Sequence, residues 1–122
     1  MPAKSYELHG VRVLECEHAL RNDRDAVELI PAVWENRAGW LVVPIECLDD
    51  DFFRLNTRIA GEIIQRFVTY RVRIAIVGDI SRHLAESSAL RDFVYESNRG
   101  EQVWFVPDLE ALGERLKRLQ LL

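Results

Sequence analysis

Two short polar segments contain the side chains best suited to hold a ligand. One follows the strand-like run 73–77, and the other closes a segment with helical periodicity. A carboxylate after a strand can serve as a base, a metal ligand or a hydrogen-bond acceptor, and a guanidinium can grip a carboxylate or phosphate with two parallel hydrogen bonds. Ligands of open α/β sheets bind at the carboxyl ends of the strands, so we predict a ligand site where the two segments meet. The candidate residues are Asp79, Ser81, Glu96, Asn98 and Arg99.

Structural roles compete with this interpretation and are the favoured explanation for single residues. Asp79 can stabilise its own turn through the backbone, aided by Gly78. Arg99 lies at the end of a predicted helix, where a cation complements the helix dipole. The turn after residue 77 matches neither the GxxxxGK[ST] loop nor GxGxxG, so we do not expect a nucleotide to bind through such a loop.

The sequence contains no complete catalytic or metal-binding motif. It has no GxSxG turn and no HExxH helix, and its serines lack an identifiable base. The two cysteines form no CxxC pair and are best explained as small buried residues. A zinc site is conceivable only if distant residues converge, namely Cys16, His18, Cys47 and His83. We therefore predict no metal and no cofactor, and we expect no enzymatic activity while keeping an enzyme as the alternative.

A second polar group lies along a predicted helix. Glu62, Gln65 and Arg66 recur at steps of three and four residues, which is typical of a solvated helix face. Together with Arg58 they are our candidates for the rim of a protein interface. Thr57, which would lie about two turns inside the predicted helix over 51–70, is the candidate for phosphorylation.

Length, charge and hydropathy limit the classes of protein to which this chain can belong. The 122 residues suit a single domain, 1–122, and 48% of them are apolar, enough for one core. The net charge is −4, with basic and acidic residues interleaved, so we do not expect nucleic acid as a partner. No apolar run approaches the ~20 residues that cross a bilayer, and the first residues resemble no signal peptide. We expect a cytoplasmic protein that does not bind membranes.

Apolar periodicity predicts strands that alternate with helices. Residues 6–9 and 11–16 read as a hairpin around Gly10, and Pro31 is expected to kink or split the first helix. One long helix is predicted from its apolar stripe over 51–70. The remaining predictions are a first helix from 22 or 23 to 38, strands at 40–45, 72–77 and 102–106, a helix from 87 or 88 to 98, and a final helix from 107. This order predicts an α/β domain with about four helices and a mixed, mostly parallel sheet, whose first hairpin supplies an antiparallel edge.

Long segments of the chain resemble the bacterial domain-of-unknown-function family 4180, from about Tyr6 to Leu119. The segments that carry the resemblance are DFFRLNT (51–57), IAGEIIQRFVTY (59–70), RIAIVGDIS (73–81) and LRDFVYESNRG (90–100). The family pattern has Gly after the Thr that precedes the second long helix, where this chain has Arg58. The family carries no established activity to transfer.

The order of elements is also similar to that of STAS domains, the sulfate-transporter and anti-sigma-antagonist domains. Many of these interaction modules are switched by phosphorylation of a Ser or Thr at a helix start, but this chain has no Asp-Ser pair there. The resemblance implies a non-enzymatic regulatory or protein-interaction module with a protein partner. The alternatives are a small-molecule binder or enzyme with its site near Asp79, and a homo-oligomer joined through Trp40, Gly61, Trp104 and Phe105.

Overall fold

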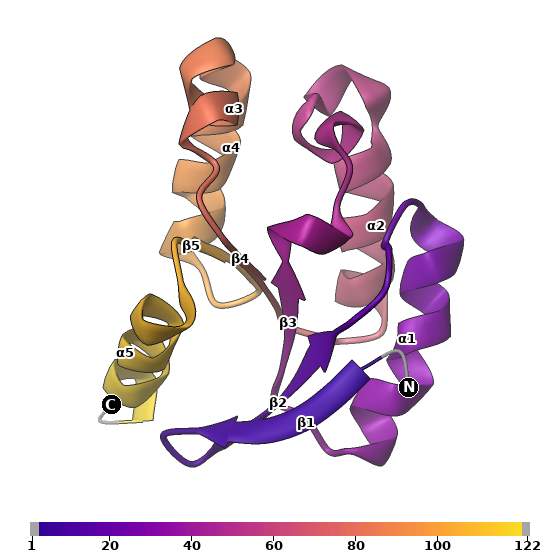
Figure 1. Cartoon of the computed structure of the whole chain (residues 1–122), viewed down its shortest axis with the longest axis vertical. Coiled ribbons are helices and arrows are strands. Elements are labelled where there is room, and N and C mark those ends of the chain that lie inside the picture. Colours follow the sequence, from indigo (N-terminus) through magenta and orange to yellow (C-terminus); the bar gives the residue numbers. More distant parts are fainter. Residues whose placement is uncertain (1–2, 121–122) are drawn as a thin grey trace.

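The computed structural model describes residues 3–120, which form one five-stranded sheet and its covering helices (Figure 1). The strands are β1 (Ala3–Leu8), β2 (Val11–Cys16), β3 (Trp40–Pro44), β4 (Ile74–Val77) and β5 (Val103–Val106). The α-helices are α1 (Asp23–Glu35), α2 (Ile59–Thr69), α3 (Ser81–Glu86), α4 (Ser88–Arg99) and α5 (Leu109–Gln120). Three 3-10 turns lie between β3 and α2: η1 (Ile45–Cys47), η2 (Asp50–Phe53) and η3 (Leu55–Thr57).

The sheet has the strand order β1-β2-β3-β4-β5. β1 pairs antiparallel with β2 through a tight turn at His9 and Gly10, both of which have positive φ. β2, β3, β4 and β5 are mutually parallel. The inner strands are short, continuous apolar runs because helices cover both of their faces. The predicted mixed, mostly parallel sheet with an antiparallel edge is confirmed.

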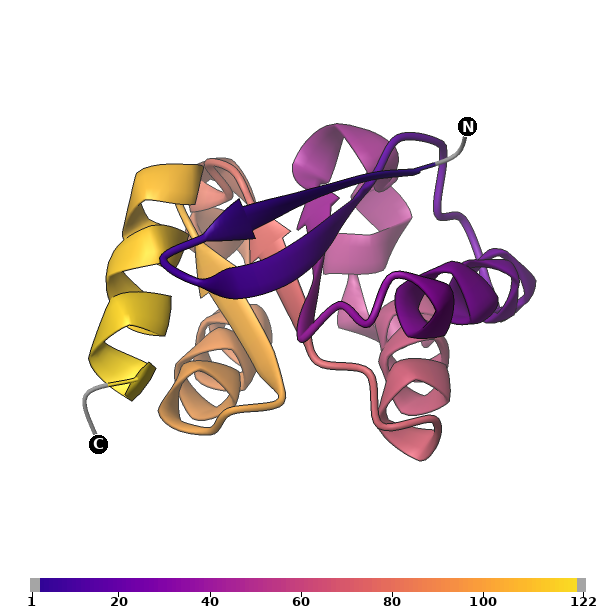
Figure 2. The same cartoon turned by 90° about the horizontal axis from the view of Figure 1, so that it is seen from below.

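Helices lie on both faces of the sheet. Strands β2 to β5 are added in sequence order, so successive right-handed crossovers place α1, α2 and α4 on the same face. Helix α5 follows the last strand and packs on the opposite face, far from α1 in both views (Figures 1 and 2). Alternation along β3 follows these layers: Leu41 and Val43 face the larger helical layer, and Trp40 and Val42 face α5.

The single long helix predicted over 51–70 is wrong. The segment makes two 3-10 turns, η2 and η3, and α2 begins only at Ile59. Arg58 separates them because its backbone is left-handed, with φ 66° and ψ 3°, which an α-helix cannot contain. The apolar spacing misled the prediction, since a 3-10 turn also places residues three apart on one side.

Two further points concern the helices. Of the two effects expected of Pro31, a split is excluded, because helix α1 continues without interruption from Asp23 to Glu35. The polar turn after β4 leads directly into the six-residue helix α3, which the sequence reasoning did not predict. The remaining strands and helices begin and end within a few residues of their predicted limits. No helix within residues 3–120 is both long enough and apolar enough to span a lipid bilayer.

Candidate functional site

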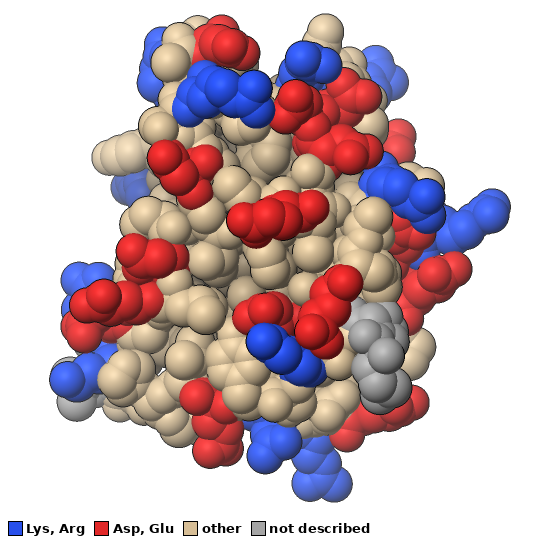
Figure 3. Space-filling model, viewed as in Figure 1, with Lys and Arg blue, Asp and Glu red and all other residues tan. Residues whose placement is uncertain are grey.

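The loops after β2, β3, β4 and β5 gather at one edge of the molecule, because these parallel strands all end there (Figure 1). This carboxyl edge contains Asp79 and Ser81 after β4, and the 3-10 turns after β3. Figure 3 shows acidic and basic side chains interspersed over one face of the molecule, without a continuous basic patch. The charge distribution thus points to no particular ligand, so a ligand must be inferred from the contacts of the individual candidate residues.

Asp79 stabilises the turn into α3. Its Oδ1 accepts hydrogen bonds from the Ser81 backbone N–H at 2.9 Å and from the Ser81 hydroxyl at 2.6 Å. These two hydrogen bonds hold the pKa of the exposed Asp79 carboxyl below its usual value. Gly78 precedes it with φ 148°, and a Cβ there would lie 2.5 Å from the Ile45 side chain. The turn is thus fixed by a close backbone approach and by local hydrogen bonds.

Asn98 covers the outer edge of the last strand. Its Nδ2 donates to the Phe105 carbonyl at 3.1 Å, and its Oδ1 accepts from the Phe105 N–H at 2.7 Å. The amide side chain thus imitates the backbone of a further strand. Because β5 is an edge strand, this pairing satisfies backbone groups that would otherwise be open to another chain.

Arg99 lies away from Asp79. The Arg99 guanidinium pairs with the Glu96 carboxylate at 3.6 Å and lies 5.8 Å from the centre of the Tyr95 ring. All three side chains are exposed. The two paired residues are one helical turn apart on the surface of α4, where such ion pairs contribute little to stability.

The structure brings together three of the five predicted ligand residues. Asp79, Ser81 and Asn98 line a hollow of about 280 Å³ whose other walls are mostly apolar, including Ile80 and Phe105. Arg99 lines a different hollow, and Asn98 is the one residue that lines both. Glu96 lines neither of the two hollows. Ligand binding by these residues remains a prediction.

A cluster around His83 was missed by the sequence reasoning. The His83 ring stacks on Phe53, with ring centres 4.3 Å apart, and its Nε2 lies 3.7 Å from Asp50 Oδ1. Arg82 donates to the same Asp50 oxygen at 3.0 Å. These groups line a hollow of about 380 Å³ between the η2 and η3 turns and the region of α3. An imidazole beside a carboxylate is a common pair in acid–base chemistry. The sequence feature that could have revealed the cluster is that both segments follow neighbouring parallel strands, β3 and β4.

The two cysteines meet, although they are far apart in the sequence. The Cys47 thiol donates to the Cys16 carbonyl at 3.5 Å, and the Cys16 thiol donates to the His18 carbonyl at 3.2 Å. Burial raises the pKa of both thiols, that of Cys47 to about 12. Within residues 3–120 no group of three or more His, Cys, Asp or Glu side chains is placed to hold a metal ion. His83 lies instead against Phe53.

The predicted interface residues do lie around one surface groove. Arg58, Glu62, Gln65 and Arg66 line a hollow of about 440 Å³, together with Gly61 and Asp23. The Arg66 guanidinium donates to the Asp23 carboxylate at 3.0 Å, which ties α2 to the beginning of α1. A Cβ added at Gly61 would meet no atom within 4 Å.

Thr57 lies directly before α2, rather than two turns inside a helix as expected. Its hydroxyl contacts the carbonyls of Asp51 and Arg54, each at 2.8 Å, and accepts from the Ile59 N–H at 3.3 Å. The half-buried hydroxyl therefore joins the 3-10 turns to the first turn of α2.

Comparison with known proteins identifies a family and no relative of known activity. No curated protein matches the chain, and no solved structure matches it. The model of a family described as a domain of unknown function, DUF4180, matches residues 8–116, which is nearly the whole chain. This match agrees with the resemblance of the segments between 51 and 100. The chain belongs to the family of unknown function DUF4180.

Proposed function

We propose that this chain is a non-enzymatic regulatory module that binds a partner protein at the α2 groove, the hollow lined by Asp23, Arg58, Gly61, Glu62, Gln65 and Arg66. The observation that carries the proposal is the surroundings of Gly61. Gly61 is the third residue of α2, and glycine is a poorer helix former than Ala, by up to about 1 kcal/mol in a helix interior. Neither the sheet nor another helix packs on this glycine, since a Cβ there would meet no atom within 4 Å. The absence of a side chain at Gly61 would allow a partner protein to approach the backbone of α2 closely.

The charges around the groove suit a polar protein surface. Arg66 is already paired with Asp23, whereas Arg58 and Glu62 are exposed and form no ion pair within the described part of the chain. A partner can therefore meet one cation and one anion without breaking an existing pair. Exposed charges of this kind contribute to specificity and association rate more than to affinity.

Thr57 would give the module a switch. Phosphorylation replaces the hydroxyl hydrogen that contacts the carbonyls of Asp51 and Arg54, so the η2–η3 segment must rearrange. The added negative charge would lie at the amino end of α2, where the helix dipole favours it, beside Arg58. Partner binding would then depend on the modification state of a residue next to the groove.

The architecture supports the same proposal by analogy. The order β-β-α-β-α-β-α-α-β-α, in which α2 begins two residues after Thr57, is similar to that of STAS domains apart from the additional short helix α3. An analogy of fold does not by itself transfer a function, and the proposal therefore rests on the groove.

Site-specific photo-crosslinking in the native host tests the proposal. A photoreactive residue at Gln65, in the groove, is compared with one at Glu114, which is exposed on α5 across the sheet. We expect a discrete protein adduct from Gln65 and none from Glu114. Adducts of equal yield from both positions, or none from Gln65, would contradict the proposal.

The second candidate is a small-molecule site near Asp79, favoured by the hollow of about 280 Å³ at the sheet edge. Its volume lies just below the range of about 300–1,000 Å³ that is typical of small-molecule sites. A thermal-shift screen against metabolites separates the two. A ligand at one hundred times its dissociation constant stabilises the fold by about 2.7 kcal/mol, and the shift should disappear in Asp79→Asn if the site is there.

A further inference from the structure

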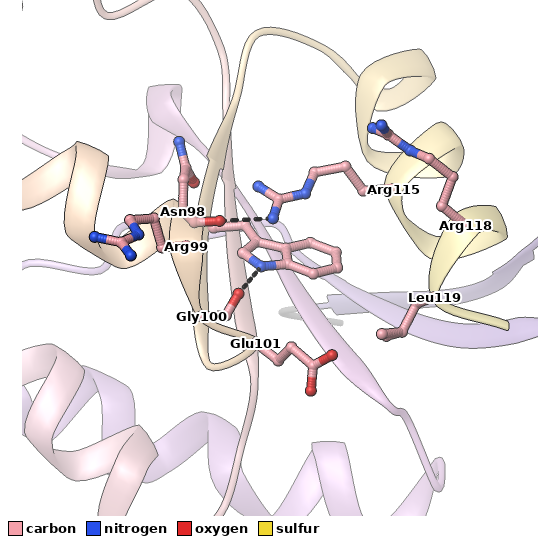
Figure 4. A pocket seen from close by; sticks show the side chains of 8 residues that line it. Asn98, Arg99, Gly100, Glu101, Arg115, Arg118 and Leu119 are labelled. Carbon is pink, nitrogen blue, oxygen red and sulfur yellow. Dashed lines mark hydrogen bonds between the residues drawn. The ribbon is translucent and has the colours of Figure 1, made fainter. Parts of the chain in front are cut away.

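Another hollow, which shares only Asn98 with the hollow near Asp79 and no residue with the α2 groove, lies between the end of α4, the start of β5 and the outer helix α5 (Figure 4). Its volume is about 560 Å³. Arg115 and Arg118 line it from α5, one helical turn apart, and Trp104 lines it from β5. We name it the α5 hollow.

The Arg115 guanidinium is held in place without a carboxylate partner. It lies over the Trp104 ring, 4.0 Å from the ring centre, and its Nη2 donates to the Asn98 carbonyl at 2.7 Å. Trp104 is itself fixed, since it stacks on Trp40 at 4.1 Å and donates to the Gly100 carbonyl at 2.7 Å. Within residues 3–120 no Asp or Glu forms an ion pair with Arg115, so most of its donors remain free for a ligand.

Arg118 adds a second guanidinium to the same hollow. In Figure 4 the Arg115 side chain extends from α5 toward the end of α4, while Arg118 leaves the same helix one turn later and lies along α5. Arg118 also has no acidic partner in the described part of the chain. Burial lowers the pKa of Arg115, and repulsion from Arg118 lowers it further. The chain has a net charge of −4, so this pair of positive charges is a local exception. A bound anion would reduce the repulsion between the two guanidinium groups.

The other charges of the α5 hollow do not cancel this pair. Arg99 lines the rim and is already paired with Glu96. Glu101 supplies one carboxylate and forms no salt bridge with either α5 arginine. With two free guanidinium groups and one carboxylate, the hollow keeps a positive charge.

We propose that the α5 hollow binds a small phosphorylated metabolite, with its phosphate between the guanidinium groups of Arg115 and Arg118. Guanidinium groups match phosphate oxygens with paired hydrogen bonds. The volume exceeds the size of free phosphate and falls within the range of small-molecule sites, which leaves room for an organic part against Leu119. This site would provide the module with an input separate from its partner surface.

A structural role is the competing explanation for Arg115 alone. Its hydrogen bond to the Asn98 carbonyl lies near the end of α4, where a cation complements the helix dipole. This explanation does not extend to Arg118, which makes no such bond. Substitution of Arg118 therefore tests the ligand site without removing the structural contact.

Calorimetric titration of the whole chain at low ionic strength, with ribose 5-phosphate as the probe, tests the proposal. Ribose serves as the uncharged control, and a phosphoserine peptide tests for a protein-borne phosphate. We expect saturable binding of ribose 5-phosphate, none of ribose, and a loss of about tenfold or more in affinity in Arg118→Gln, as for a hydrogen bond to a charged group. Arg24→Gln, which removes an exposed charge on α1, should bind like the unaltered chain.

Equal affinity in Arg118→Gln and Arg24→Gln would overturn the proposal, because binding would then follow overall charge. Absence of saturable binding of ribose 5-phosphate, or equal binding of ribose, would overturn it as well. Binding of the phosphopeptide alone would replace the metabolite by a protein ligand. Arg118→Gln should melt at the temperature of the unaltered chain, so that a lost affinity cannot reflect unfolding.

Discussion

Replacing Arg58 by glycine should stabilise the fold. Arg58 adopts φ 66° and ψ 3° between η3 and α2, and its side chain is exposed. A residue with a Cβ in the left-handed region is strained by about 1–2 kcal/mol, whereas glycine has no such strain. The resemblance to the family implies Gly at this position, in agreement with the backbone that the structure requires.

The expected gain is smaller than the strain itself. Glycine also makes the unfolded chain more flexible, which offsets about 0.5–1 kcal/mol. The exposed Arg58 side chain makes no hydrogen bond or ion pair within the described residues, so little else is lost. The net expectation for Arg58→Gly is a rise of about 0.5–1 kcal/mol in the free energy of unfolding.

Urea denaturation followed by circular dichroism measures this gain, as an increase of about 0.3–0.5 M in the midpoint at unchanged slope. The control is Arg58→Ala, which removes the guanidinium but keeps the Cβ and should bring no gain. The reasoning is refuted if Arg58→Gly lowers the midpoint, or if alanine raises it as much as glycine. Arg71 offers a repeat, because it has φ 58° after α2 and closes that helix with a bond from its N–H to the Val68 carbonyl.

Three further predictions concern single residues. Gly78→Ala should destabilise the fold by about 2–4 kcal/mol in urea denaturation, since the new Cβ would meet Ile45 at 2.5 Å and φ is 148°; unchanged stability would show that the turn can relax. Asn98→Ala should cost about 1–3 kcal/mol and speed hydrogen exchange along the outer edge of β5, and unchanged exchange would argue against the edge cover. Hydrogen bonds from Arg21 lower the pKa of Asp25, so stability that is fully present above about pH 4 should be lost as the pH falls through the lowered value. Denaturation from pH 7 to pH 2 should show this loss, and Asp25→Asn should remove that part of the pH dependence.

The sheet could be predicted from the sequence because its strands are short apolar runs bounded by turns. Residues 40–44, 74–77 and 103–106 are buried on both faces, and this is the pattern that a parallel sheet imposes. The segment before α2 could not be predicted. Its apolar spacing fits a helix, and the left-handed Arg58 that ends the 3-10 turns is a residue that rarely adopts this backbone.

Residues that share one helix face were the easiest part of the candidate sites to predict. Glu62, Gln65 and Arg66 lie together because spacings of three and four fix a helix face. Asp50 lies in η2 and His83 in α3, and they meet through the order of the strands, which apolar spacing alone does not reveal. Likewise, Arg115 reaches Trp104 only because α5 crosses to the opposite face of the sheet.

Substitution of Gly61 by arginine tests the partner surface most directly, since it separates folding from binding. A Cβ at this exposed position of α2 meets no atom within 4 Å, and arginine replaces a poor helix former. The proposal predicts that Gly61→Arg unfolds at an equal or higher urea concentration and yet loses the protein adduct formed from Gln65, while Glu114→Arg keeps it. An undiminished adduct in stable Gly61→Arg would contradict the claim that a partner binds in the α2 groove.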